Sequence, residues 1–456
     1  MEFKLGETDF GKLETMALRL AMLIVREALG EILEAMDDYL ATVRDKRRYE
    51  IREMEDRAID SVVGVIRFKR PSYKDLLTGE RVHLLDKNLK IKDHQRISEG
   101  AARVAVSLAV SGPSYRNACK KLEELLGERV VSHEGIRQLV LKTSDVIDRP
   151  KEPRIGTRRV KVLFIEADGL WTGRQGGKRP KEETRYAVVH EGWRQRYPGS
   201  REYETMREIR YIHPQGSREG FWDSLLERIE QVYDLEDTMV VINGDGASWI
   251  KEGTAFFPNC IYQYDRFHIS RDIKGALPDK ALKKEAVEAL RDNDLGRVLE
   301  ILDIGLKEAT GKERNKLKAV KKNFVSNWEY ILDYRLRLQA LGYDCSGFRG
   351  LGSVESNVGK FKSRVRGRAW SRKGIYALGN VLFKVMDGSL GSYTAQVMNR
   401  LDERLKDMAI AGARVVRKAV LDEEPGIKRG HFPCLDRGTQ GYAVMFRRLV
   451  EEGYAN

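Results

Sequence analysis

The segment from residue 160 to residue 264 restricts the fold most, because short apolar runs alternate there with stretches of helical periodicity. Apolar runs of this length predict buried strands, and apolar residues three and four positions apart predict a helix. The predicted strands are 160–167, 186–189, 208–212, 239–242 and 260–264, with a helix before the fourth strand and a short helix before the fifth. Three strands, a helix, a strand, a helix and a strand is the order of an α/β fold of the RNase H-like type.

Two of the predicted strands run directly into an Asp-Gly pair, namely Asp168-Gly169 and Asp245-Gly246. A single Asp-Gly pair is most often an ordinary turn. Two such pairs after buried strands favour a site, because ligands bind at the carboxyl ends of parallel strands in open α/β sheets. Neighbouring carboxylates repel each other unless a cation lies between them, so we expect Asp168 and Asp245 to share metal ions.

A third carboxylate, Glu355, lies on a later predicted helix and would complete the site. Mg²⁺ prefers oxygen ligands and commonly binds through carboxylates together with substrate phosphate. We therefore predict that Asp168, Asp245 and Glu355 are both the catalytic residues and the ligands of two Mg²⁺ or Mn²⁺ ions. Paired ions of this kind activate an attacking oxygen and stabilise the leaving oxygen in phosphoryl transfer.

Two further motifs lie near these carboxylates in the sequence. A basic segment follows Glu355 and predicts either a path for DNA phosphates or a solvated basic helix. Its members are Lys360, Lys362, Arg364, Arg366, Arg368, Arg372 and Lys373, with Trp370 among them as a candidate for stacking on a base. The pair Asp265 and His268 has two open interpretations, a structural hydrogen bond or a supporting role in the chemistry.

Residues 98–147 predict three short helices, and the third begins after Ser132, a residue type that caps helices well. A helix-turn-helix and a plain helical bundle both fit this pattern. The chain holds 82 Lys and Arg against 69 Asp and Glu, a net charge of +13, which favours a polyanionic partner and hence DNA. The outward residues of the third helix would then contact DNA: His133, Arg137, Gln138 and Lys142.

The remaining sequence completes a division into six segments. We expect an N-terminal helix (10–49) and β-ribbon in 1–97, a helix-turn-helix in 98–147, the first part of the α/β core in 159–277, a charged helical insertion in 278–341, the second part of the core in 342–390 and a C-terminal region in 391–456. The ribbon is predicted from the Val- and Ile-rich run 58–70 and from 81–85. The first helix would serve either packing or dimerisation.

Cysteine spacing and hydropathy exclude several classes of protein. None of the four cysteines forms a C-x-x-C pair, so no zinc knuckle is expected, and reduced thiols suit the cytoplasm. The chain has no apolar run of ~18 residues, so no membrane span is expected. We expect a bacterial cytoplasmic protein associated with the nucleoid.

The motifs together resemble those of the ISLre-type insertion-sequence transposases, bacterial proteins related to the Mutator-like group. The similar stretches are Ile165–Gly169, Glu191–Trp193, Ile242–Ile250, Asp265–His268, Gly352–Val358 and the basic segment through Ser371. This resemblance implies a DDE site in an RNase H-like core with a helical insertion before the glutamate. The first Asp is Asp168, the second is Asp245 and the Glu is Glu355, while the related superfamily's Asp-x-x-His signature falls on Asp265 and His268.

The resemblance implies a DNA transposase that binds terminal inverted repeats as a homo-oligomer and catalyses strand cleavage and strand transfer. Two alternatives remain at this stage. An RNase H-like nuclease without strand transfer needs the same carboxylates, whereas a non-catalytic DNA-binding descendant would be expected to have lost one. Inverted repeats flanking the gene would distinguish the transposase from the nuclease.

Overall fold

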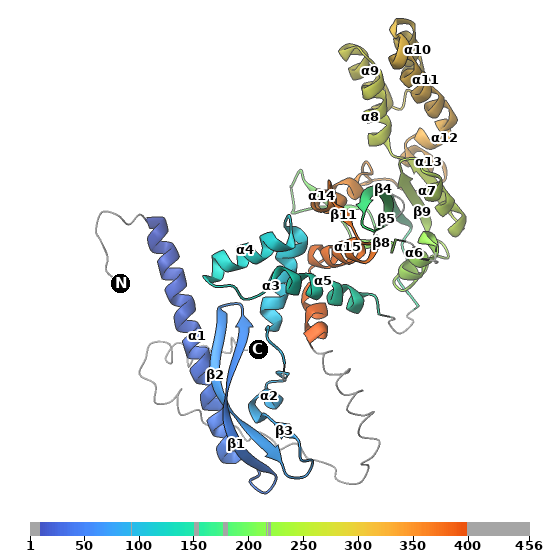
Figure 1. The fold of residues 1–456 in the computed structure, drawn as a ribbon. Coiled ribbons are helices and arrows are strands. Elements are labelled where there is room, and N and C mark those ends of the chain that lie inside the picture. The colour runs from blue at the N-terminus through green and yellow to red at the C-terminus, as the bar shows by residue number, and fades with distance from the viewer. Residues whose placement is uncertain are drawn as a thin grey trace. The chain divides into compact units, whose positions relative to one another are not determined.

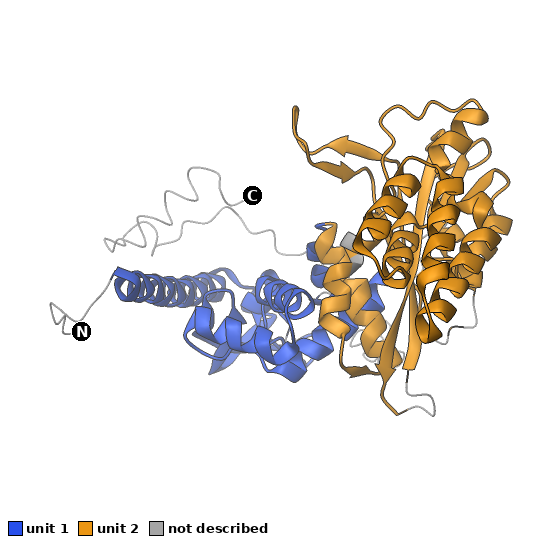
Figure 2. Cartoon of the chain, turned by 90° about the horizontal axis from the view of Figure 1, so that it is seen from above, with its two compact units in different colours: residues 1–147, 388–456 blue, residues 148–387 orange. Residues whose placement is uncertain are grey.

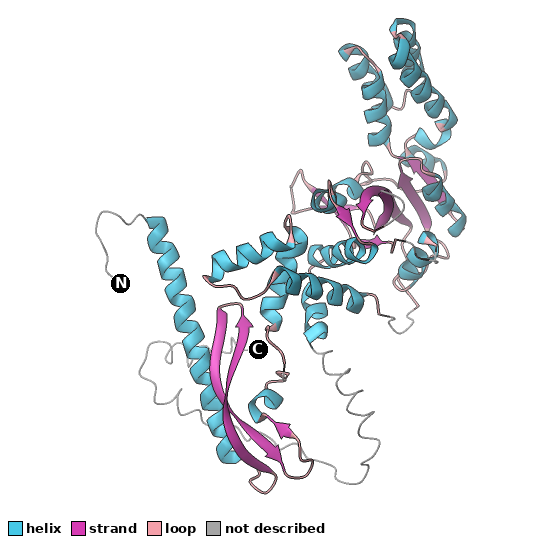
Figure 3. Cartoon of the chain, viewed as in Figure 1, coloured by secondary structure: helices cyan, strands magenta, loops and turns pink. Residues whose placement is uncertain are grey.

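The fold is mixed α/β and divides into two compact units, residues 1–147 with 388–456 and residues 148–387 (Figures 1 and 2). Figure 3 shows helices and strands in both units. The computed structural model describes residues 10–92, 94–149, 155–176, 181–215, 217 and 220–398. Most of the predicted C-terminal region 391–456 therefore lies outside the described residues. No helix within these ranges is long and apolar enough to cross a membrane.

The first unit begins with a long helix and an antiparallel ribbon. Its elements are α1 (Phe10–Val43), β1 (Tyr49–Ser61), β2 (Gly64–Asp75), β3 (Arg81–Val82) and α2 (Leu84–Asn88). The predicted helix 10–49 is thus too long, and the predicted strand 58–70 spans a turn, because Ser61 pairs with Gly64. Most of β1 is exposed and charged, so it lacks the apolar run by which a strand is recognised.

Asp37 of α1 gives the first unit a predicted dependence on pH. Its side chain is buried, and neither carboxylate oxygen has a hydrogen-bond partner among the described residues. Burial raises the pKa of Asp37 to about 7, although the nearby Arg70 opposes this shift. Because the pKa of Asp37 is higher in the folded than in the unfolded state, the contribution of this group to stability is complete below about pH 4. The contribution is lost as the pH rises towards 7.

We therefore expect Asp37→Asn to stabilise the protein by about 1–3 kcal/mol at pH 8 and by little at pH 4. The amide keeps the size of the side chain and removes the charge that burial disfavours. Urea unfolding at the two pH values measures the difference. Equal stabilisation at both values would show that ionisation of Asp37 does not contribute.

Three helices complete the described core of the first unit: α3 (Glu99–Ser111), α4 (Tyr115–Leu126) and α5 (His133–Ile147). The Ser98 and Ser114 hydroxyls cap α3 and α4 by accepting backbone N–H groups, and Gly127 ends α4 at a φ of 76°. Val397 and Met398 pack against α3 and α5, so the chain returns to this unit after the second one.

A six-stranded sheet forms the centre of the second unit, with the strand order β10-β9-β4-β5-β8 and β11 paired to β4. The strands are β4 (Val162–Arg174), β5 (Lys181–His190), β8 (Ile209–Ile212), β9 (Met239–Gly244), β10 (Cys260–Tyr264) and β11 (Ala369–Trp370). β9 runs parallel to β4 and to β10, whereas β5 is antiparallel to β4 and to β8. A separate hairpin, β6 (Trp193–Gln195) and β7 (Tyr203–Thr205), was not predicted.

Helices cover the sheet and extend beyond it. They are α6 (Phe221–Glu230), α7 (Ser248–Lys251), the 3₁₀ helix η1 (Glu252–Phe256), α8 (Arg266–Ala276), α9 (Lys280–Arg291), α10 (Leu295–Glu308), α11 (Gly311–Ser326), α12 (Trp328–Ile331), α13 (Tyr334–Ala340), α14 (Ser353–Val365) and α15 (Arg372–Met386). The span between residues 280 and 340 is helical and contains no strand.

The two faces of the central strand β4 pack against different layers, because successive side chains of a strand point to opposite faces. Leu163, Ile165 and Ala167 belong to the large core that continues through α6 into α8–α11. Phe164 points the other way and packs with Tyr334 of α13. Glu166 and Asp168 follow Phe164 at every second position, so they share its face.

Candidate active site

Asp168 lies on β4, and Asp245 follows directly after the neighbouring parallel strand β9. Glu166 of β4 is opposite Asn243 of β9, and each aspartate lies two residues farther along its chain. The strand ends differ from the prediction, because β4 continues past Asp168-Gly169 to Arg174 while β9 ends at Gly244. The reason is β5, which pairs with β4 from Phe164 to Gly173 and keeps it extended.

The Asp168 side chain is buried and hydrogen-bonded on both carboxylate oxygens. The Gly169 backbone N–H donates to Oδ1 at 2.7 Å, and the Tyr186 hydroxyl donates to Oδ2 at 2.5 Å. The Lys362 ammonium also donates to Oδ2, at 3.2 Å. Asp168 is therefore held in one orientation by its own strand, by β5 and by α14.

Lys362 connects Asp168 to Glu355. Glu355 lies in the first turn of α14, and its Oε2 accepts a hydrogen bond from Lys362 Nζ at 3.0 Å. Burial disfavours the ammonium, but the carboxylates of Asp168 and Glu355 outweigh this effect and raise the pKa of Lys362. The ammonium is therefore a counter-charge placed between the two carboxylates.

All three predicted carboxylates contribute to a raised pKa of the Tyr186 hydroxyl. Burial raises the pKa of this buried phenol most, and Asp168, Glu355 and Asp245 each raise it further by favouring the neutral form. Asp245 is partly exposed, and its Oδ1 accepts the Ala247 backbone N–H at 3.0 Å. Asp168 and Glu355 are thus joined through Lys362, and Asp245 is linked to them by its effect on Tyr186, a residue that the sequence analysis had not singled out.

The carboxylate oxygens of this region are the type of donor that a hard divalent cation prefers. These oxygens belong to three carboxylates, the ligands that Mg²⁺ prefers, and the structure already places a positive group between two of them. Within the described part of the chain, no three His, Cys, Asp or Glu side chains are gathered tightly enough to hold a metal ion. For a metal ion to bind at Asp168, Asp245 and Glu355, the three carboxylates would have to move closer together. Lys362 would also have to leave its position between Asp168 and Glu355.

Asp265, which is buried, and His268, which is partly buried, form a pair beside this region. Asp265 Oδ1 caps α8 by accepting the backbone N–H of Phe267 at 2.7 Å, and its Oδ2 lies 3.4 Å from His268 Nδ1. The interaction with the Asp265 carboxylate raises the pKa of His268, and Asp168 adds to the shift. The two side chains are thus in close contact, but His268 Nδ1 has no hydrogen-bond partner among the described residues. His268 also lies within the electrostatic reach of Asp168.

The basic residues after Glu355 differ in exposure. Lys360, Arg366 and Arg368 are exposed. Arg364 is buried, and its guanidinium lies 5.1 Å from the centroid of the Trp370 ring, whose Nε1 donates to the Val365 carbonyl. Arg364 and Trp370 therefore pack on each other in this structure instead of facing a common path.

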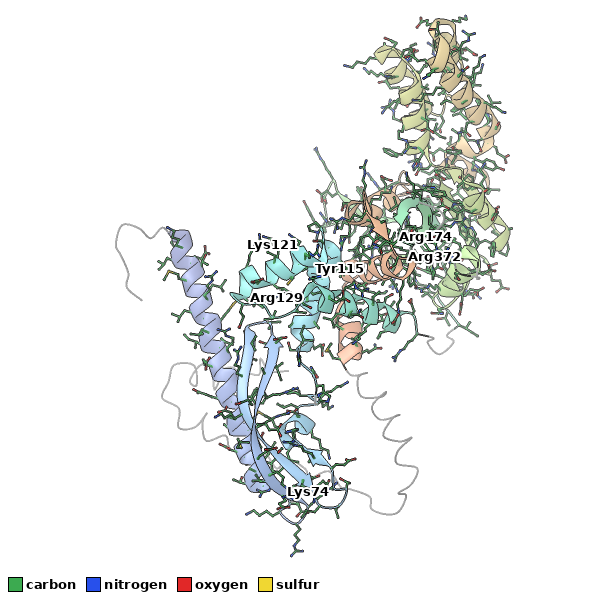
Figure 4. All side chains as sticks on the ribbon, in the orientation of Figure 1. Lys74, Tyr115, Lys121, Arg129, Arg174 and Arg372 are labelled. Atoms are coloured by element: carbon green, nitrogen blue, oxygen red, sulfur yellow. The ribbon has the colours of Figure 1, made fainter. Side chains whose placement is uncertain are left out.

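The side chain of Glu182 on β5 binds two of the basic residues labelled in Figure 4. Arg174 Nε lies 3.3 Å from Glu182, and Arg372 Nη2 lies 2.9 Å from it. Arg372 is therefore paired with Glu182, although its side chain is exposed. Lys373 lies next to Arg372 at the start of α15.

In the first unit, the residues predicted to contact DNA lie on α5. His133 and Arg137 are partly exposed, and Gln138 and Lys142 are exposed. Glu134 binds two of these side chains, Arg137 at 2.7 Å and Gln138 at 2.9 Å. Hydrogen bonds from Arg137 and Gln138 lower the pKa of Glu134 to about 2, so it is ionised at neutral pH. Of the other labelled residues in Figure 4, Tyr115 and Lys121 lie on α4, and Arg129 follows that helix.

Three buried residues near the carboxylates escaped the sequence analysis: Tyr186, His190 and Glu166. Tyr186 and His190 lie in or beside an apolar run that predicted only a strand, and the β4–β5 register alone brings them opposite Asp168 and Phe164. Glu166 did give a signal, since it is a charge inside a run of buried apolar residues.

Comparison with known proteins identifies the family of the chain. A family model described as "Uncharacterised protein family (UPF0236)" matches residues 7–399. The UPF0236 protein in vanSb 3'region of Streptococcus gallolyticus is 29% identical over 381 residues, which cover 80% of each chain. A UPF0236 protein of Caldanaerobacter subterraneus subsp. tengcongensis, whose name joins eleven locus designations, is 27% identical over 357 residues, covering 77% of this chain and 72% of the relative. The chain belongs to the UPF0236 family.

Proposed function

We propose that this protein is a DNA transposase of an insertion sequence with a DDE active site formed by Asp168, Asp245 and Glu355. One observation carries the proposal: Lys362 joins Asp168 of β4 to Glu355 of α14, next to the strand β9 that leads into Asp245. Three carboxylates that can share metal ions are the ligands that metal-dependent phosphoryl transfer needs.

The topology of the second unit supports an RNase H-like core. The central strand β4 has the parallel β9 on one side and the antiparallel β5 on the other, and the chain order matches the predicted one apart from the hairpin β6–β7. A helical segment, α9–α13, comes between β10 and the glutamate helix α14. This order agrees with an insertion before the third carboxylate.

The three carboxylates would hold two Mg²⁺ or Mn²⁺ ions, which supply activation of the attacking oxygen and stabilisation of the leaving oxygen. The other side chains have separate tasks. Tyr186 fixes the orientation of Asp168 through its hydroxyl hydrogen bond. Lys362 offsets the negative charge of Asp168 and Glu355 until it is displaced. Its ammonium can then contact a DNA phosphate, because the Lys362 side chain is only partly buried.

The name of one relative supports a mobile element. It joins eleven locus designations of a single bacterial strain under one protein. Many loci for one protein are the expected trace of an element that has copied or moved itself within a genome. We extend this interpretation to the present chain as part of the proposal, with DNA as the partner and a homo-oligomer assembled on DNA in the bacterial cytoplasm.

A nuclease of the same fold without strand transfer is the second candidate, since it needs the same carboxylates. The products distinguish the two. A transposase incubated with a cut element end and a target plasmid joins the 3′ end to the plasmid, whereas a simple nuclease releases fragments and joins none.

We further propose that residues 98–147 are a helix-turn-helix domain that reads the element ends through α5. Arg137→Ala or Gln138→Ala should then alter base preference at one position, at about 1–3 kcal/mol for each bidentate hydrogen-bonded pair with a base that the substitution removes. Competition binding with single-base variants of the terminal repeat measures the change. Glu134→Gln is the matched variant, because it releases Arg137 and Gln138 without removing either. If all variants rank the sequences as the parent does, α5 does not read bases.

A further inference from the structure

Glu166 has no place in the proposed chemistry, although it lies two residues before Asp168 on the same face of β4. The side chains of Glu166 and His190 are both fully buried. A buried carboxylate is unfavourable for stability unless its hydrogen bonds compensate for the loss of water. The hydrogen-bond partners of Glu166 therefore indicate its structural role.

One oxygen of Glu166 binds the start of the helix that carries Glu355. Its Oε2 accepts the Gly352 backbone N–H at 2.7 Å and the Val354 backbone N–H at 3.4 Å. Gly352 is the N-cap residue of α14 and has a φ of 154°, a conformation that residues with a Cβ rarely adopt. No side chain among the described residues of this segment caps α14, so Glu166 of β4 satisfies amides that a local cap would otherwise bind.

The other oxygen of Glu166 is held by His190 of β5, with Oε1 and Nε2 3.1 Å apart. The Gly192 backbone N–H donates to His190 Nδ1 at 3.2 Å, so this nitrogen is unprotonated. The proton of a neutral His190 therefore resides on Nε2 and is donated to Glu166. The ring is fixed by stacking on Phe164, with centroids 5.1 Å apart, and by Trp193.

We propose that Glu166 is a positioning residue that clamps the N-terminus of α14 to β4 and so holds Glu355 opposite Asp168, with His190 fixing the clamp. The groups that bind Glu166 in the described part of the chain are all donors, and they come from α14 and β5. Glu355 is in the first turn of α14, so a shift of that turn moves its carboxylate directly. The inference rests on the proposed function for the role of Glu355, but the clamp itself can be measured without DNA.

The decisive variant is Glu166→Gln in the full chain. The amide has one accepting oxygen in place of two, so it cannot satisfy both α14 and the donor on His190. We expect faster hydrogen exchange at the Gly352 and Val354 amides, and Mn²⁺ binding weakened about 10–100-fold, the usual effect of losing a partner that orients a metal ligand. The matched control is Glu182→Gln on β5, which lies in the same sheet and pairs with Arg174 and Arg372.

A double variant tests whether Glu166 acts through Glu355. If it does, Glu166→Gln with Glu355→Gln binds Mn²⁺ no more weakly than Glu355→Gln alone. Further weakening in the double variant would overturn the positioning role. In the parent protein the Gly352 and Val354 amides should exchange as slowly as those of β4, and exchange at the rate of an exposed loop would overturn the clamp even if Glu166→Gln fails to fold.

The outcomes separate the clamp from the proposed function. If Glu166→Gln speeds exchange of the α14 amides and weakens Mn²⁺ binding, but the parent protein never cuts DNA, the clamp is supported and the transposase is rejected. DNA cleavage by a Glu166→Gln variant with unchanged exchange and unchanged Mn²⁺ binding would reject the clamp and leave the transposase standing.

Discussion

We expect Asp168→Asn, Asp245→Asn and Glu355→Gln each to lower DNA strand cleavage on the order of 10³-fold or more. Each change keeps the shape of the side chain and removes a negatively charged oxygen from the region around Tyr186 and Lys362. Phosphoryl transfer depends on positioning and charge neutralisation, so losing one carboxylate affects the transition state most. The measurement is cleavage of a labelled terminal-repeat duplex with Mg²⁺ or Mn²⁺.

DNA binding is the internal control for these variants. Binding should remain largely intact, because it depends on basic surface and on residues 98–147, and a less negative site repels phosphate less. Glu300→Gln on α10 is the matched substitution, since its side chain is 65% exposed and lies in the helical segment. A variant that still cuts at the parental rate removes that residue from the catalytic set, and joint loss of binding and cleavage indicates misfolding instead.

Phe164→Ala should destabilise the second unit by about 3–5 kcal/mol. Phe164 is fully buried on β4, and its ring centroid lies 5.0–5.7 Å from those of its four aromatic neighbours. These neighbours are His190, Trp193, Tyr334 and Phe348. Removing the ring leaves a cavity where α13 and the segment leading to α14 meet the sheet, and guanidinium unfolding measures the loss.

Trp171→Ala on the same strand is the control for this prediction. Its side chain is 64% exposed, so its removal opens no cavity and should change stability by no more than about 0.5 kcal/mol. If both variants lose the same stability, truncation on β4 is costly for a reason other than the aromatic cluster.

The mixed α/β class could be predicted because the strands beside the site are apolar runs. The predicted strands that begin at Val160 and Met239 correspond to β4 and β9. Asp168 lies on β4, and Asp245 comes directly after β9. The pairing partners could not be predicted, because register depends on contacts between distant segments. Tyr186 and His190 were therefore invisible as partners of Asp168 and Glu166, although their strand was expected.

The elements that the sequence analysis predicted wrongly have a different cause in common. Their charged residues hide the alternation of buried and exposed positions. Most of the charged strand β1 was not predicted, since its exposed residues show no clear alternation. Arg364 counted towards a basic surface, but it is buried against Trp370 because an arginine stem can pack on an aromatic face. A basic residue within a helix does not by itself reveal which way the helix faces.

The most direct test of the proposal uses the parent protein and the DNA that flanks its gene. A duplex carrying the flanking terminal repeat is labelled at the 3′ end of the element and incubated with the protein and Mg²⁺ or Mn²⁺, beside a duplex of scrambled sequence. The proposal predicts a metal-dependent cut at the repeat boundary that chelation abolishes, followed by joining of the new 3′ end to a target plasmid. Binding to the repeat without any cut in either metal would contradict a DDE transposase.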